Sequence, residues 1–556
     1  MFPHLIHLIF LLGSMKEFGT NKTSDEYNLT VYHTSNIQGR FDDQEKGGLA
    51  KISHYLTETR AKNQSSLYLD AGGVFIGTEL FFVHGINVTS AVMNYLKPDA
   101  VTLGFSEFHL GLDRLKWYLE QIEFPVIVSN IIYDDQTSEF EKLIETKLVL
   151  EMGAKQVGIL GFIDPDVNKI YKLKELKFED PVYAIKTHLE ALKTIDKVDI
   201  VIVLSHVMNH ESDTFNLEVI ALDGVNAVIS GQYLKNPEDE NVICYHAQFF
   251  KNNTAMPDGC FATNLGFFEI NIKDDEVFTE VYEVALSKVD EKYTEMIQPF
   301  VDNVTEFNEE IIGTSKVFLD GENCWKQECN FGNLLADSMI YYRSIRYKGL
   351  DWSDTPIAII NARSLKQSIN TTSHNYKLRK IDILSSISNN EILYLIELEG
   401  VYLREILNYG LTMLKSDSIK EEKEMNQKYL SVSGIYAIYD YNHTESILVR
   451  CAHCRVPKYS DITSNMIYKI ITSQFMALGG DGYTQLAINA RTIKPMYASN
   501  LALNLIEYIQ SRKDIFPEVQ ERITFIEYTE DSSRFSTIIS VVLLLCLLLI
   551  NFLLYF

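Results

Sequence analysis

Short apolar runs alternate with helix-like stretches through the first half of the chain. A helix is expected over residues 47–60, and strands are expected over residues 28–33, 66–70, 100–103, 125–128, 156–161 and 199–204. The apolar runs end in polar or small-residue turns. This rhythm is typical of an α/β domain with stacked sheets, whose functional groups lie on loops after the strand ends.

The same pattern divides the chain into two parts. We expect a first α/β domain over residues 27–286. Residues 287–312 are charged and helix-prone and carry no turn signals, so they predict a stiff linker helix. A second α/β domain is expected over residues 313–530.

Both ends of the chain are strongly apolar. Residues 5–12 form an apolar run followed by small residues, which predicts a secretory signal peptide over residues 1–19. Since no Lys or Arg precedes the run, and His4 and His7 interrupt it, a buried amphipathic start is the alternative. Residues 538–556 carry no charge and follow Ser532 and Ser533, which favours a GPI-attachment signal over residues 531–556. A simple hydrophobic membrane anchor is the alternative there.

Sequons and cysteines also favour an exported chain. Asn-x-Ser/Thr sequons, potential glycan sites that define a glycoprotein if used, occur at Asn21, Asn28, Asn63, Asn87, Asn252, Asn303, Asn370 and Asn442. Six cysteines outside the tail form close sequential pairs, for which we expect disulfides Cys324–Cys329, Cys451–Cys454 and, with its connectivity open, Cys244–Cys260. Zinc is the alternative at Cys451 and Cys454, but it needs further ligands nearby.

Composition excludes two broad classes. The 556 residues are 46% hydrophobic and 12% aromatic, enough to bury a core, which rules out a disordered chain. With 50 Lys and Arg against 75 Asp and Glu, the formal net charge is −25. Binding to nucleic-acid backbones needs clustered basic residues, so no nucleic-acid partner is expected.

Segments at the expected strand ends resemble the metallophosphoesterase 5′-nucleotidase family, which includes ecto-5′-nucleotidases and secreted apyrases. In chain order, the first-domain segments are VYHTSNIQGR (31–40), GGLAK (47–51), DAGG (70–73), TLGFSEFH (102–109), SHV (205–207) and SGQYL (230–234). They are similar to the family's HTND-x-H, GGLAR, DAGD, TLGNHEFD, LSH and GGHxH segments. The second domain carries CNFGN (329–333), YLSVSG (429–434), CAHCRVP (451–457) and GGDGY (479–483). These resemble ECNLGNL, FLQVSG, CxxCRVP and GGDGF.

The resemblance implies a fold and a chemistry. The fold is α/β: an N-terminal calcineurin-like four-layer α/β/β/α sandwich followed by a C-terminal α/β nucleoside-binding domain. The chemistry is phosphate-ester hydrolysis by two divalent metals that activate a water. Such a pair of dications is held by carboxylates and imidazoles, because fixed negative charge offsets their mutual repulsion.

The metal positions that the resemblance assigns are degenerate in this chain. Only His206 keeps its ligand type, and the others are Asn36, Gln38, Gly73, Phe105, Gln232 and Leu234. The catalytic His and its orienting Asp fall at Ser106 and His109. We therefore expect no metal cofactor. The alternative is an atypical site for Zn, Mg or Mn that uses His109, His206, Asp70 and Glu107.

The second domain keeps more of the family's binding residues. By resemblance, Tyr429 and Tyr483 stack on the base, Asp481 accepts the ribose hydroxyls, Asn361 lies near the base and Lys366 replaces a phosphate-binding Arg. An adenine nucleoside or nucleotide is thus the expected partner.

Three functions follow. The favoured one is an extracellular, GPI-anchored pseudoenzyme of the family that binds nucleosides or nucleotides, with a homodimer possible by resemblance. The alternatives are an active ecto-5′-nucleotidase of nucleotide catabolism with an atypical metal site, and a structural or adhesion glycoprotein that keeps only the fold. The sequence leaves enzymatic activity open.

Overall fold

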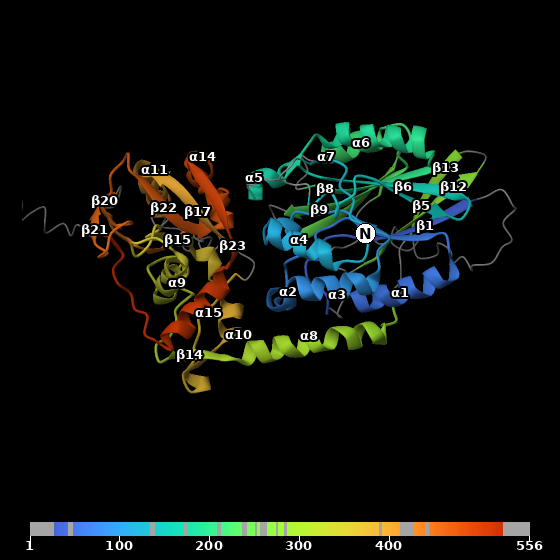
Figure 1. Ribbon diagram of the computed structural model, residues 1–556. Coiled ribbons are helices and arrows are strands. Elements are labelled where there is room, and N and C mark those ends of the chain that lie inside the picture. Colours follow the sequence, from blue (N-terminus) through green and yellow to red (C-terminus); the bar gives the residue numbers. More distant parts are fainter. Residues whose placement is uncertain are drawn as a thin grey trace, which may run out of the picture.

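The computed structural model describes residues 27–42, 48–133, 139–171, 173, 176–207, 213–235, 242–250, 253–255, 264–273, 276–282, 286–388, 392–411, 428–439 and 444–525. Two groups of sheets lie side by side, and a long helix, α8 (Glu291–Glu309), runs along the first group and ends at the second, as Figure 1 shows.

Two mixed sheets form the first group. The five-stranded sheet has the order β13 (Glu276–Tyr282), β12 (Gly266–Lys273), β1 (Tyr27–Thr34), β2 (Ser66–Asp70) and β3 (Ala100–Val101). The six-stranded sheet has the order β11 (Asn253–Ala255), β10 (Val242–Phe250), β9 (Ala227–Lys235), β8 (Ile200–Val207), β6 (Lys155–Ile163) and β5 (Leu148–Met152).

Successive side chains of β1 point to opposite faces of its sheet and belong to two different hydrophobic cores. Val31 is buried in the cluster that also contains Leu69, Ile159 and Ile202, so it faces the six-stranded sheet. Tyr32 belongs to a second cluster, formed with helices α1 (Gly48–Lys62), α3 (Ile86–Leu96) and α4 (Leu112–Gln121).

A third cluster covers the outer face of the six-stranded sheet with α6 (Pro181–Ala191) and α7 (Asp213–Ile220). Three cores between successive layers make a four-layer α/β/β/α sandwich, which confirms the predicted fold class.

The predicted strands occur, with one exception. β1, β2, β6 and β8 cover the expected runs, and β3 keeps only the first half of residues 100–103. Residues 125–128 were expected to form a strand, but this prediction was wrong. The segment makes only isolated bridges, Val126 with Val101 and Ile127 with Glu145. Pro125 precedes them and lacks an N–H, so it cannot donate to a ladder.

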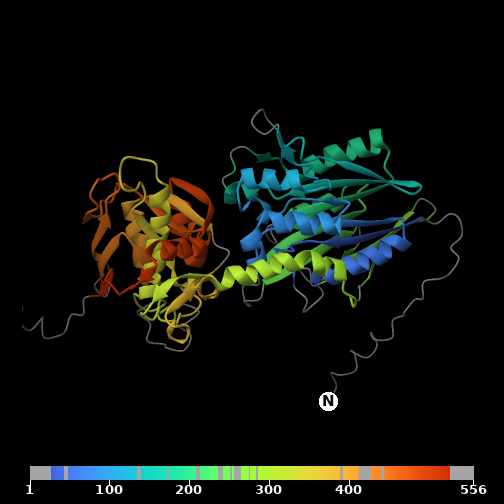
Figure 2. The same cartoon turned by 60° about the horizontal axis from the view of Figure 1, so that its bottom comes forward.

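Helix α8 begins at a polar cap that also joins it to α1. Asp290 Oδ1 accepts from the N–H groups of Lys292 and Tyr293, and its Oδ2 accepts from Ser53 Oγ at 2.6 Å. The helix packs along α1, α2 (Glu79–His84) and α3 and ends against α10 (Lys380–Ser386). Figure 2 shows this helix running along the first group of sheets toward the second group.

The second group is built around one large core. Its central sheet has the order β18 (Leu430–Ser433), β15 (Ile357–Asn361), β22 (Ile467–Ser473), β17 (Ile392–Glu399) and β23 (Thr492–Asn500). Helices α9 (Asn330–Arg346) and α15 (Leu501–Arg512) pack beside each other, and α11 (Gly400–Leu411) and α14 (Thr484–Asn489) contact β17. Smaller sheets flank this core: β16 (Lys377–Arg379), β14 (Ile311–Ser315) and β24 (Asp514–Ile515), and β21 (Tyr459–Asp461), β20 (Thr444–Arg450), β19 (Ile435–Tyr439) and β25 (Ile523–Phe525).

Two of the three expected disulfides are formed, Cys324–Cys329 and Cys451–Cys454. Cys260, the predicted signal peptide, the hydrophobic tail and the sequons at Asn21, Asn252 and Asn442 lie outside the described residues, as does the side chain of Cys244. Within the described ranges, no helix combines the length and apolar character needed to cross a bilayer.

Candidate functional site

Three chain segments at the ends of strands meet at one place in the first domain. The loop after β1 runs beside the loop after β2, because Asn36 N donates to Gly72 O at 2.7 Å and Gln38 N donates to Gly73 O at 3.0 Å. His206, near the end of β8, hydrogen-bonds through Nδ1 to Ala71 O at 2.7 Å. The fold thus brings Asn36, Gly73 and His206 together.

Gly73 lies at the centre of this cluster with almost no free space around it. Its φ is +83°, and a Cβ added there would lie 2.4 Å from Asn36 Oδ1 and 3.0 Å from His206 Cε1. Real side chains do not approach so closely, so a carboxylate at this position requires Asn36 and the imidazole to move. Asn36 itself has φ +48°, a conformation that asparagine tolerates better than most residues.

His206 is buried, with 2% of its surface exposed. Burial lowers its pKa to about 4, so the imidazole is neutral at physiological pH. The ring of Phe105 lies 5.9 Å from it, centroid to centroid. The surroundings of the one retained ligand type are therefore a glycine backbone, an amide and an aromatic ring.

Glu107 is the buried carboxylate nearest to Gly73. Its Oε1 accepts from Gly73 N and Val74 N at 2.9 and 2.7 Å, and its Oε2 accepts from Gly104 N at 3.0 Å. Both oxygens are thus used to fix the two loops. Burial raises the pKa of Glu107 despite these N–H donors.

Asp70, at the end of β2, is similarly occupied. It accepts from Thr34 Oγ1 at 2.6 Å and from Gly72 N at 2.9 Å. Burial raises its pKa to about 7.

These residues do not fit a pair of divalent metal ions. Among the described residues, no three His, Cys, Asp or Glu side chains are grouped so as to hold a metal. Gln232 and Leu234 lie on β9, and their side chains are outside the description. What is described offers one imidazole and neutral amides, and no free carboxylate.

The two catalytic positions lie on one turn, where His109 N donates to Ser106 O at 3.1 Å, but their side chains have different surroundings. Ser106 donates from Oγ to Glu107 Oε2 at 3.0 Å and accepts from Phe75 N at 3.2 Å, which is a structural role within the 3₁₀ turn η2 (Ser106–Phe108). His109 follows this turn and lines a separate pocket against the second domain.

In the second domain, two of the expected binding residues lie close together, beside an arginine that was not expected there. Asn361, at the end of β15, donates from Nδ2 to Asp481 Oδ2 at 2.6 Å. Arg363 Nε lies 3.1 Å from the same oxygen, and Arg363 also lies over the ring of Phe475. Lys366 is exposed on the following loop, where its backbone N–H donates to Ser386 O.

The two tyrosines expected to stack on a base are buried. Tyr429 is 2% exposed and Tyr483 is 1% exposed. Tyr483 donates its hydroxyl to Lys428 O, and Tyr429 has a buried hydroxyl without a partner in the part of the chain described. Neither ring offers a free face for stacking in this arrangement.

Phe475 and Arg363 were missed by the sequence reasoning. Phe475 is half-buried and lies on α13 (Gln474–Ala477), just before the turn η8 (Gly480–Gly482) that carries Asp481. It is the partly exposed ring that Arg363 covers. In the sequence, Phe475 lies six residues before Asp481. This spacing could have marked it as a binding residue, but many aromatic residues of the buried core have a similar spacing.

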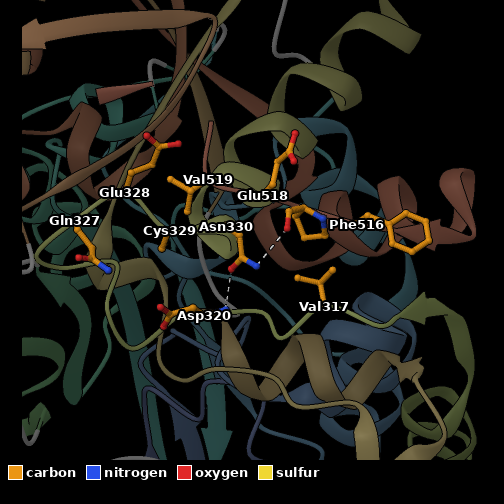
Figure 3. A pocket seen from close by; sticks show the side chains of 10 residues that line it. Val317, Asp320, Gln327, Glu328, Cys329, Asn330, Phe516, Glu518 and Val519 are labelled. Atoms are coloured by element: carbon orange, nitrogen blue, oxygen red, sulfur yellow. Dashed lines mark hydrogen bonds between the residues drawn. The ribbon is translucent and has the colours of Figure 1, made fainter. Parts of the chain in front are cut away.

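A cavity of about 470 Å³ lies elsewhere in the second domain. Figure 3 shows it between the Cys324–Cys329 loop and residues 516–519, with Asp320, Glu328 and Glu518 among its lining residues. Asn330 closes one side, donating to Pro517 O at 3.3 Å and accepting from Asp320 N at 2.9 Å. None of the candidate binding residues lines it.

Comparison with known proteins first defines the class. The chain matches a 5′-nucleotidase precursor from Thermus thermophilus with a TM-score of 0.53 at 21% identity, over 90% of this chain and 100% of that one. A 5′-nucleotidase structure from Staphylococcus aureus gives a TM-score of 0.63 at 16% identity, over 90% and 99%. The fold is therefore the two-domain arrangement of these structures.

Sequence relatives include apyrases and 5′-nucleotidases. Residues 311–488 match the family model "5′-nucleotidase, C-terminal domain". An apyrase of Tabanus yao is 27% identical over 84% of this chain and 89% of its own length. A 5′-nucleotidase of Mus musculus is 26% identical over 90% and 91%. The chain is therefore similar to apyrases and 5′-nucleotidases along most of its length, and its second domain matches the C-terminal domain of 5′-nucleotidases.

Proposed function

We propose that this protein is a nucleoside- or nucleotide-binding member of the 5′-nucleotidase family without phosphohydrolase activity. Hydrolysis in this fold needs a pair of metal ions to activate water and neutralise the phosphate. The observation that carries the proposal is the closed packing around Gly73, where a Cβ would lie 2.4 Å from Asn36 Oδ1. The place of a bridging carboxylate is filled by neutral atoms.

Binding is supported by the polar cluster of the second domain. Asp481 is a carboxylate on a Gly-rich turn, half-buried, and suited to accept two hydroxyl protons of a ribose. Phe475 lies on α13, just before this turn, and presents a partly exposed ring. A base stacked on an aromatic ring gains about 1–3 kcal/mol. Arg363 and Asn361 now hold Asp481, so a nucleoside has to compete with them.

The same proposal extends to location. Both ends of the chain carry apolar segments suited to export and to a GPI anchor, and two disulfides lie in the second domain. We place the protein at the cell surface, as a glycoprotein, with a homodimer as the assembly to test.

Two measurements on the full chain, released from the surface of expressing cells, test the proposal. The first is phosphate release from AMP, ADP and ATP with Mg²⁺, Zn²⁺ or Mn²⁺, with the mouse 5′-nucleotidase as positive control. The expected result is release at the level of a no-protein blank and no stoichiometric metal. Turnover that EDTA abolishes establishes the active alternative instead.

The second measurement is calorimetric titration with adenosine and AMP. We expect binding that Asp481→Asn weakens at least tenfold, while the matched change Asp461→Asn, at an exposed position on β21, leaves it unchanged. Absence of binding in the wild-type protein leaves the adhesion glycoprotein as the function.

A further inference from the structure

A small pocket lies between the two domains, beside the turn that carries the two catalytic positions. Its first-domain wall includes Ile76, Phe82 and Leu110, and its second-domain wall includes Ile392 and Leu503. Phe82 packs against the core of the second domain, so the pocket belongs to a formed interface. Its volume is about 140 Å³.

The lining is uncharged. No Asp, Glu, Lys or Arg is among the described residues that line the pocket. A charged ligand would lose its hydration there without compensation, so the pocket selects a neutral one.

Two of the three polar lining residues have hydrogen-bond partners. Ser499 Oγ accepts from Asn504 Nδ2 at 3.0 Å. Asn500 caps α15, with its Oδ1 accepting from Ala502 N and Leu503 N.

His109 is the third polar residue that lines the pocket. It is 6% exposed, and its side chain makes no hydrogen bond or ion pair with any residue that the structure describes. The ring nitrogens of His109 are not among the fully enclosed side-chain atoms that lack a partner in the described part of the chain, so they are open to a ligand in the pocket that His109 lines. A neutral imidazole offers one N–H donor and one nitrogen acceptor.

We propose that this interdomain pocket binds a small neutral aromatic molecule with one hydrogen-bonding group, of the phenol class, through His109. The size fits, because an apolar cavity of about 150 Å³ in another protein holds benzene. Phe82 supplies an aromatic wall, and His109 supplies the hydrogen bond. The ligand touches both domains at once, so it stabilises their contact. This inference does not depend on nucleoside binding.

The test compares phenol with toluene, which has a similar shape but no hydrogen-bonding group. Binding to the full chain is measured by ligand-observed NMR and titration. In His109→Leu, which keeps the side-chain volume but removes the polar atoms, we expect phenol to bind about tenfold more weakly and toluene to bind equally or more tightly. His374→Leu, at an exposed histidine of the second domain, is the matched control and leaves both affinities unchanged.

A second variant keeps His109 and fills the pocket from the other domain. Leu503→Phe adds volume to the second-domain wall, and we expect it to abolish binding of both ligands while the thermal unfolding temperature stays within a few degrees of the wild type. The proposal is overturned if wild-type protein binds neither ligand at 10 mM. It is also overturned if His109→Leu binds phenol as the wild type does, or if Leu503→Phe leaves binding intact.

Discussion

Arg363 holds the carboxylate of Asp481, with 3.1 Å between Nε and Oδ2, and its guanidinium lies 5.5 Å from the ring centroid of Phe475. Asn361 donates to the same carboxylate oxygen. The acceptor that the family resemblance assigns to a ribose is therefore occupied by the protein itself. In the proposed nucleoside site, the affinity therefore depends on one exposed side chain, that of Arg363.

Arg363→Ala is expected to increase the affinity for adenosine about two- to fivefold. The ion pair is partly exposed, and such pairs contribute about 0.2–1 kcal/mol. Removing the guanidinium frees Asp481 and uncovers Phe475, so a nucleoside no longer displaces it. Titration calorimetry measures the change, and Arg346→Ala, which removes an ion pair with Glu507, is the control. Unchanged or weaker adenosine binding contradicts this view of the site.

Gly73→Ala is expected to destabilise the first domain by more than the backbone conformation alone explains. Its φ of +83° costs a non-glycine residue about 1–2 kcal/mol. Overpacking against Asn36 and His206 adds about 1–3 kcal/mol. Urea unfolding measures the sum.

Gly153→Ala separates these two contributions. Gly153 has φ +65°, but an added Cβ would meet only Ser65 Oγ at 3.7 Å. The difference between the two variants therefore reports the packing at Gly73. Equal losses of stability in the two variants indicate that the cluster has room for a side chain, which undermines the argument against a metal pair.

The sandwich and most of its strands could be predicted from the sequence because their signals are local. Apolar and polar residues alternate along β1 and β2, and continuous apolar runs mark β6 and β8. The proximity of Asn36, Gly73 and His206 could also be predicted, since the ends of neighbouring strands lie close together. The sequence did not reveal that Tyr483 is buried or that Arg363 pairs with Asp481. Those facts depend on contacts across 55 and 118 residues of sequence separation, which no local pattern encodes.

The two disulfides are expected to differ in their resistance to reduction. Cys324 and Cys329 are buried, at 0% and 2% exposure, whereas Cys451 and Cys454 lie on a partly exposed loop. A reductant reaches the second pair without unfolding. Alkylation after mild reduction of the folded protein, followed by peptide mass spectrometry, should label Cys451 and Cys454 first. Labelling of both pairs at the same rate contradicts the burial of the first.

The acid sensitivity of the protein is expected to depend on His109. Burial lowers the pKa of folded His109 to about 3, whereas an unfolded histidine has a pKa of about 6.5. Below pH 6.5 the unfolded chain therefore binds a proton that the folded protein does not. The free energy of unfolding falls as the pH decreases toward 3, and this contribution is fully present only above about pH 6.5.

His109→Leu removes this proton uptake. Between pH 7 and pH 5, the free energy of unfolding of the variant should rise by about 2 kcal/mol relative to that of the wild type. Urea unfolding at pH 7, 6 and 5 measures the difference, in which the contributions of Asp70 and His206 cancel because both proteins contain them. His374→Leu, at an exposed histidine, should follow the wild type throughout. A constant difference between His109→Leu and the wild type across this range means that solvent reaches the imidazole of His109, and that the pocket between the domains is open to water.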